Sequence, residues 1–175
     1  MALTYIPLYS TTLGSTSNDI TFSNIDQTYT DLVCIVTGKG VYTTSTFIAL
    51  MLRFNGDSGT NYSSQEMFSL DYTADKATQN TSAVGAISWL AADTAMDNSI
   101  SSTKFEIHDY AATNKWKSGI ARAATFESNT TFGIQIQNWT WRNTAAITSL
   151  TFRNPDSASG FYAGTVFDIY GIKRA

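Results

Sequence analysis

The chain is poor in the residues that build disulfides and metal sites. Its 175 residues include one cysteine and one histidine, so an intrachain disulfide cannot form. Zinc sites draw several ligands from Cys and His, so we expect no metal site and no cofactor. Cys34 lies in the apolar segment DLVCIV, which predicts a small buried side chain and not a nucleophile.

Charged residues are also scarce. They make up 14% of the chain, against about 25% in an ordinary soluble domain. The eleven Lys and Arg residues are scattered and form no basic stripe, so we expect no nucleic-acid partner. The low charge indicates that the surface is polar but uncharged and that much of it is covered by other subunits in an assembly. The alternative is a monomeric all-β domain whose Ser and Thr residues simply suit strands.

Long apolar runs and a leader segment are missing too. No stretch approaches the roughly 18 apolar residues that a membrane-spanning helix needs, so we expect no membrane partner. The first residues, MALTYIPLYS, have no basic region and no sustained apolar stretch. We therefore expect no signal peptide.

What the sequence does have is alternation with period two. TKFEIHDY, TFGIQIQNW and TVFDIYGI each place apolar residues on one strand face, as a half-buried strand requires. In the second segment, the face expected toward the core carries Phe132, Ile134 and Ile136. DLVCIVT and FIALMLRF are apolar on both faces, which is typical of central strands. With weaker candidates we expect roughly nine to eleven short strands, the pattern of a sandwich or barrel.

Little else interrupts this pattern. Leu90–Ser99 could hold one or two helical turns, and residues 71–82 are expected to form a loop. Pro7 cannot donate to a ladder, so its strand should lie at a sheet edge or bend there. No repeat or linker is evident, so we expect one antiparallel β-sandwich domain over residues 1–175. Its edges carry few charged residues, which favours pairing between subunits and hence a homo-oligomer.

Groups that could carry catalysis do not converge in the sequence. His108 and Asp109 offer two members of a triad, but neighbouring strand residues point to opposite faces. We therefore expect no catalytic residues and no enzyme. Two carboxylates brought together by the fold would suffice for a glycosidase, and the sequence does not pair any of its Asp and Glu residues.

FNGDSGTNYSS, residues 54–64, is rich in turn-forming residues. Asn55 and Asp57 alternate as in a calcium loop, but a single carboxylate makes a weak site. Asn-Gly and Ser-Gly supply the positive φ values of a hairpin turn, so we expect a hairpin connection. Asp57, Asn61 and Tyr62 would then sit at an exposed tip, as candidate contact residues.

QNWTWRN places two indoles on one strand face. Such a pair can belong to the core, anchor a subunit interface or stack on sugar rings. We favour core or interface over a sugar platform. The candidate contact residues for a partner are Tyr5, Tyr9, Trp139 and Trp141.

Four segments run in order along the chain: TTLGSTSNDITFSNIDQTYTDL, LRFNGDSGTNYS, WRNTAAITSLTF and FYAGTVFDIYGIK. In order and spacing they resemble a group of small virion proteins of tailed bacteriophages, many of them from cyanobacterial and marine phages. The likeness runs from about Leu13 to Lys173 and is weakest over residues 71–102. Each motif is short and made of common residues, so the order carries the resemblance.

The resemblance implies a jelly-roll-like sandwich, often trimeric, that attaches to the virion as a separate part. It leads us to expect a non-enzymatic structural protein that is assembled into the virion in the bacterial cytoplasm. A trimeric capsid decoration, or cement, protein bound to the major capsid protein or to other virion proteins fits best. The alternative is a tail-fibre or receptor-binding module that recognises a host surface glycan. A polysaccharide-degrading enzyme with two carboxylates is the third hypothesis.

Overall fold

The computed structural model describes residues 5–70, 73–82, 85–126, 132–154 and 160–173. In this part of the chain every regular element is a strand, which confirms the all-β prediction. The fourteen strands are β1 (Tyr5–Thr12), β2 (Asp19–Ser23), β3 (Asp31–Gly38), β4 (Gly40–Val41), β5 (Phe47–Phe54), β6 (Tyr62–Leu70), β7 (Thr73–Ser82), β8 (Gly85–Ala91), β9 (Ser101–Ile107), β10 (Lys117–Phe126), β11 (Phe132–Trp141), β12 (Ser149–Arg153), β13 (Gly160–Phe161) and β14 (Val166–Ile172).

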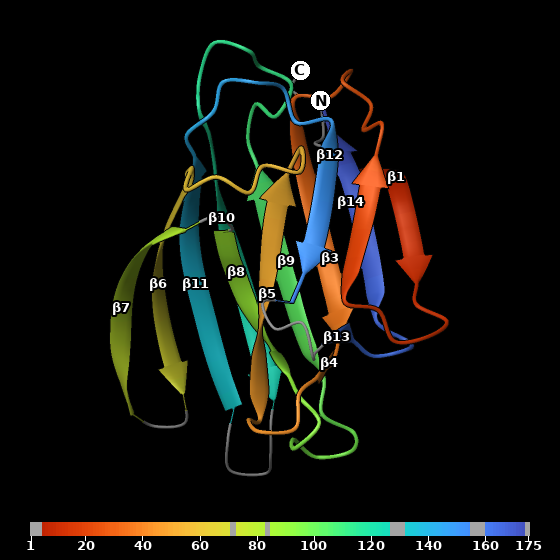
Figure 1. Cartoon of the computed structure of the whole chain (residues 1–175), viewed down its shortest axis with the longest axis vertical. Helices are drawn as coiled ribbons and strands as arrows, with labels where there is room; N and C mark the ends of the chain where they lie inside the picture. Colours follow the sequence, from red (N-terminus) through yellow and green to blue (C-terminus); the bar gives the residue numbers. More distant parts are fainter. Residues whose placement is uncertain (1–4, 71–72, 83–84, 127–131, 155–159, 174–175) are drawn as a thin grey trace.

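The strands form two packed sheets and a small ribbon (Figure 1). An eight-stranded sheet has the order β1-β14-β3-β9-β10-β11-β6-β7, a four-stranded sheet has the order β2-β12-β5-β8, and β13 pairs with β4. The described pairings are all antiparallel. The larger sheet extends past the smaller one, so β7 lies at its outer edge beyond β8. The predicted antiparallel sandwich is confirmed.

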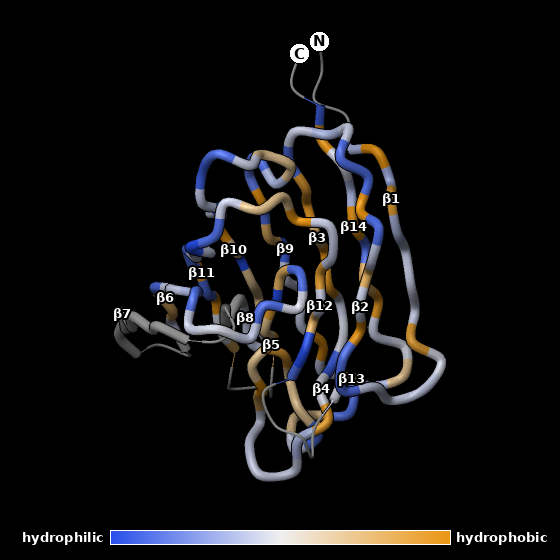
Figure 2. The backbone as a smooth tube through the Cα atoms, turned by 45° about the horizontal axis from the view of Figure 1, so that its top comes forward, coloured by the Kyte–Doolittle hydropathy of each residue, from blue (hydrophilic) through white to orange (hydrophobic). Residues whose placement is uncertain are grey.

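Aromatic side chains fill the space between the two sheets. Phe152 on β12 packs against Phe105 on β9, with ring centroids 5.5 Å apart. Phe54 on β5 packs against Trp139 and Trp141 on β11, at 5.1 and 5.4 Å. Each such ring removes roughly 150–250 Å² from water, so these contacts hold the sheets together. Figure 2 shows hydrophobic residues recurring along the core strands β3 and β14.

Two single residues behave as predicted. Cys34 is buried on β3, and burial raises the pKa of its thiol, so it has the environment of an unreactive core side chain. Pro7 lies on β1 at the edge of the large sheet, and the pairing of β1 with β14 shifts register between Pro7 and Tyr9.

Two segments differ from their predictions. Residues 73–82, expected as a loop, form β7 and pair with β6. An edge strand needs neighbour hydrogen bonds on one side only, so this polar segment can pair without an apolar alternation. Leu90 and Ala91 end β8, and residues 92–99 form turns and no helix. With the two-residue strands β4 and β13, β7 brings the strand number above the nine to eleven expected.

Candidate functional site

The outer surface of the eight-stranded sheet carries a group of large, exposed apolar side chains. Strand register places them side by side: Met67 on β6 is opposite Ile136 on β11, and Ile134 is opposite Ala124 on β10. The large members are between 41% and 61% exposed. We call this surface the apolar face. Its members are Met67, Ile100, Ala124, Phe126, Phe132, Ile134 and Ile136.

One end of the apolar face is hollowed. Phe126 and Phe132 are opposite each other at the ends of β10 and β11. Together with Ile100, which precedes β9, they line a hollow of about 560 Å³. The apolar face therefore offers both a flat region over the strands and a depression into which an apolar side chain can insert.

The inner side of the same part of the sheet is polar. Gln135 and Gln137 on β11 are 4% and 1% exposed. The Gln135 Nε2 donates to Glu66 Oε2 at 2.7 Å, whereas the Oε1 atoms of both glutamines have no hydrogen-bond partner among the described residues. The isoleucines of β11 thus face outward while its glutamines face the interior.

This orientation of β11 reverses the prediction that Phe132, Ile134 and Ile136 point toward the core. The reason lies at the other end of the strand. Trp139 and Trp141 have the same parity as the glutamines, and in a strand alternate side chains share a face. Burying two indoles against the four-stranded sheet outweighs burying the isoleucines, because each indole removes more apolar surface from water.

Charges border the apolar face on one side. Arg122 on β10 pairs with Glu106 on β9 at 2.8 Å, and Lys104 pairs with the same carboxylate at 3.1 Å. Burial on its own would raise the pKa of Glu106, but the hydrogen bonds and charges of Lys104 and Arg122 outweigh it and lower the pKa. The cluster thus holds two positive charges and one negative charge, so one net positive charge lies at the border of the apolar face.

The loop at residues 54–64 is a tight turn that joins the two sheets. Asn55 and Gly56 have φ values of 51° and 69°, and the Asp57 N–H donates to the Phe54 carbonyl oxygen at 2.9 Å. The turn that the Asn-Gly pair predicts is present. The prediction of a hairpin is wrong, because β5 and β6 belong to different sheets. The chain crosses over so that Phe54 and Tyr62 both pack inside, with centroids 6.0 Å apart.

Asp57 is the centre of a hydrogen-bond network in this loop. Its Oδ2 accepts from Trp141 Nε1 at 2.7 Å and from Asn61 Nδ2 at 2.9 Å, and its Oδ1 accepts from the Gly59 N–H at 2.9 Å. Burial on its own would raise the pKa of Asp57, but these hydrogen bonds and nearby Arg53 outweigh it and lower the pKa. The carboxylate and Asn61 therefore fix the loop and satisfy an indole N–H.

Three of the predicted contact residues are in the core. Trp139, Trp141 and Tyr62 are 3%, 1% and 1% exposed. The Tyr62 hydroxyl accepts from the Phe54 N–H at 3.0 Å, so it lies inside the sandwich and not at an exposed tip. The hypothesis that these side chains meet a partner is wrong; the core alternative for the two tryptophans is right.

The two remaining candidates lie on β1, away from the loop. Tyr5 is 44% exposed and accepts a hydrogen bond from Lys104 Nζ at 2.8 Å. The Tyr9 hydroxyl donates to the Ser23 carbonyl oxygen at 2.9 Å and so ties β1 to β2. Five strands lie between β1 and β6 in the sheet. The predicted site residues are therefore not brought together.

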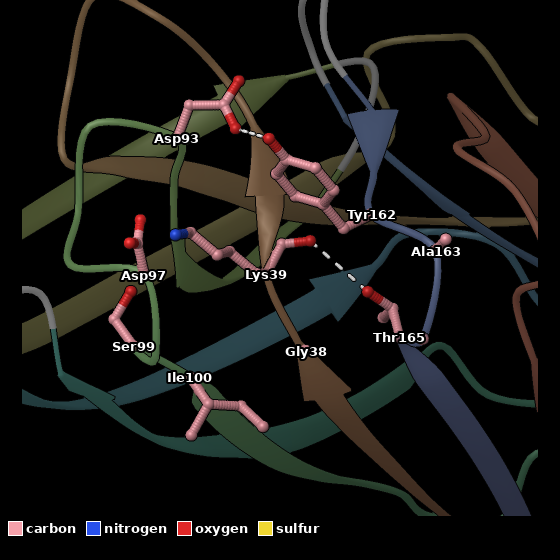
Figure 3. A pocket seen from close by; sticks show the side chains of 10 residues that line it. Gly38, Lys39, Asp93, Asp97, Ser99, Ile100, Tyr162, Ala163 and Thr165 are labelled. Atoms are coloured by element: carbon pink, nitrogen blue, oxygen red, sulfur yellow. Dashed lines mark hydrogen bonds between the residues drawn. The ribbon is translucent and has the colours of Figure 1, made fainter.

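A polar pocket of about 440 Å³ lies where three loops meet (Figure 3). Lys39, between β3 and β4, donates from Nζ to the Met96 carbonyl oxygen at 3.1 Å, and the Tyr162 hydroxyl donates to the Asp93 carboxylate. Ser99 is 5% exposed, and its Oγ has no hydrogen-bond partner among the described residues. The lining residues are far apart in sequence and share no motif, so sequence reasoning did not find the pocket.

His108 and Asp109 follow β9, outside the strand. The His108 Nδ1 is 3.7 Å from Asp31 Oδ1, and Asp109 has a φ of 48° and pairs with Lys115 at 3.1 Å. Asp31 also accepts from the Asp109 N–H at 2.9 Å. Within the described ranges, no three His, Cys, Asp or Glu side chains gather closely enough to hold a metal ion. The same residues contain no helix of the length and apolarity that a membrane crossing needs.

Comparisons with known proteins add little. No protein-family model and no curated protein matches the chain. Among solved structures, the chain aligns with a chain in the structure of infectious bursal disease virus Gx strain, at 13% identity and a TM-score of 0.13. The alignment covers 98% of this chain and 39% of that chain. A TM-score this low supports no statement about fold or function.

Proposed function

We propose that the chain is a non-enzymatic structural protein of a tailed-phage virion, a trimeric decoration protein that binds the capsid and stabilises the head. The apolar face carries this proposal. Monomeric soluble proteins rarely expose contiguous apolar patches larger than a few hundred Å², so such a face favours a protein that works while other proteins cover it. The low charge and the resemblance to small virion proteins support the same role.

The proposed mechanism is mechanical. A protein added to a symmetric particle in many copies gains avidity from the number of its contacts, so each contact can be modest. Contacts made by apolar and uncharged side chains suit this role, because charged residues are depleted at the centre of protein interfaces. The decoration protein would hold neighbouring capsid subunits together against the outward pressure of packaged DNA.

Cryo-electron microscopy of purified particles tests the proposal. We expect density for this sandwich at repeated positions on the head, in groups of three. Copies confined to the tail would contradict the decoration role. Absence of the chain from purified particles would contradict a virion role altogether.

The polar pocket favours a second candidate function, a receptor-binding module for a host surface glycan. Ligand sites fix orientation with a few convergent polar groups, and Lys39, Asp93, Asp97 and Ser99 provide them beside the ring of Tyr162. We expect binding to host lipopolysaccharide on a glycan array, lost in Asp97→Asn and kept in the control Asp19→Asn. Equal binding by both variants, or no binding by the unmodified protein, would contradict this function.

A further inference from the structure

We infer that further copies of this chain cover the apolar face, so that this face is the subunit interface of the proposed trimer. The inference rests on the proposed function in that it names the partner of the same surface. It assigns to self-association a set of residues on β6, β10 and β11, together with Ile100 before β9, and none of them is among the contact residues predicted from sequence.

The area of the apolar face suits a subunit interface. Six large side chains are each about half exposed. At about 100 Å² each they present roughly 600 Å², the upper end for the largest patch of a monomer and close to the roughly 800 Å² that each partner contributes to a standard interface. Adjoining polar side chains such as Gln65 and Asn138 are exposed on the same strands and supply the polar rim that interfaces carry.

The orientation of β11 is the second argument. The chain keeps Ile134 and Ile136 outside while it buries Gln135 and Gln137, whose Oε1 atoms have no hydrogen-bond partner among the described residues. Each buried, unsatisfied polar atom lowers stability. A covering layer on the outer side leaves the glutamines as they are but buries Ile134 and Ile136, which offsets part of this loss, as the sheets of a sandwich cover each other about 10 Å apart.

The scarcity of charge on the apolar face favours a copy of the same chain over a strongly charged partner. Across the described outward-facing residues of β6, β10 and β11, Arg122 carries the one charge, and it shares the Glu106 carboxylate with Lys104. An acidic or basic partner therefore finds no charge over the apolar side chains and one net positive charge at their border. A second copy brings the same apolar surface, whose one net positive charge lies at the border and not among the apolar side chains.

Native mass spectrometry and light scattering of the purified protein test this inference. We expect a species about three times the 19.1 kDa of one chain, and at least a tenfold weaker association in Ile134→Arg, which places a charge at the centre of the interface. Trp116→Arg is the matched control. Trp116 is 58% exposed and directly precedes β10, at the end of that strand opposite to Phe126, so the substitution should leave association unchanged. Circular dichroism checks that both variants are folded.

A cysteine at the same position gives an independent readout. Cys34 is buried, so the thiol of Ile134→Cys is the one that reacts with a maleimide in the folded protein. We expect labelling to be at least tenfold slower in concentrated protein than after dilution below the dissociation constant. Equally fast labelling at both concentrations would overturn the inference, even where Ile134→Arg fails to fold.

The outcomes separate this inference from the proposed function. If the wild-type protein stays monomeric and the thiol of Ile134→Cys is labelled equally fast at every protein concentration, self-association is overturned. The virion role is tested separately, by cryo-electron microscopy of purified particles. A dimer that Ile134→Arg dissociates supports self-association through the apolar face and contradicts the trimer.

Discussion

At the scale of single residues, Asp57 does more to stabilise the sandwich than its place in a loop suggests. Its carboxylate accepts hydrogen bonds from Trp141, Asn61 and the Gly59 N–H. Trp141 is one of the largest buried side chains, and its N–H would lose its partner if the carboxylate were removed. The loop is therefore linked to the core by the hydrogen bond between the Asp57 carboxylate and the buried Trp141.

Replacing this acceptor should destabilise the fold. We expect Asp57→Ala to lower the free energy of unfolding by about 1–3 kcal/mol, because it leaves a buried indole donor unsatisfied. Asp19→Ala, which removes an exposed carboxylate 3.7 Å from Arg153, should change it by about 0.5 kcal/mol or less. Urea unfolding curves measure both. Equal effects of the two substitutions would show that the network contributes nothing.

The same network makes part of the stability depend on pH. The pKa of Asp57 is lower in the folded protein than its usual value, which is about 3.9 in the unfolded chain. The contribution is therefore complete above that unfolded value and is lost as the pH falls through the lowered folded pKa. We expect the difference in urea midpoint between the wild type and Asp57→Ala to shrink between pH 7 and about pH 2. A constant difference would contradict this.

At the scale of the element, β10 depends on close contact with its neighbours. Gly119 is opposite Trp139 on β11 and Ile107 on β9. A Cβ at this position would lie 1.8 Å from the Glu106 carbonyl oxygen and 2.5 Å from the Trp139 ring. The absence of a side chain at Gly119 thus lets the indole pack directly against the strand.

Gly119→Ala should be strongly destabilising. Since the backbone of β9 cannot move away without breaking the ladder, we expect a loss of at least about 3 kcal/mol or a failure to fold. Gly14→Ala is the matched control, because nothing lies within 4 Å of a Cβ built there. Thermal unfolding compares them, and a Gly119→Ala protein as stable as Gly14→Ala would contradict the packing described.

The elements also show where sequence reasoning succeeds and fails. Alternation predicts β9 and β14 correctly, since the apolar residues Phe105, Ile107, Phe167 and Ile169 are all buried. In β11 the alternation divides the residues between two faces but does not show which face is buried. One face carries isoleucines at the start of the strand, and the other face carries Trp139 near its end. The edge strand β7 and the pocket of three loops lack periodic or local patterns altogether.

At the scale of the whole molecule, low charge and the apolar face together predict how assembly responds to salt. Association through apolar contacts has no ion pairs to screen. We expect the association constant to change by about twofold or less when NaCl is raised from about 0.1 M to 1 M. Analytical ultracentrifugation measures this. A tenfold or greater weakening would show that charged contacts, and not the apolar face, hold the copies together.

The buried tryptophans of β11 also protect the strand against slippage. A shift of one residue in pairing would turn every side chain of β11 to the opposite side of the sheet. Ile134 and Ile136 would gain burial, but both indoles would be exposed to water, and Asp57 would lose the hydrogen bond from Trp141 Nε1. Burial of Trp139 and Trp141 thus fixes the register of β11. It thereby keeps Ile134 and Ile136 exposed on the opposite side of the sheet.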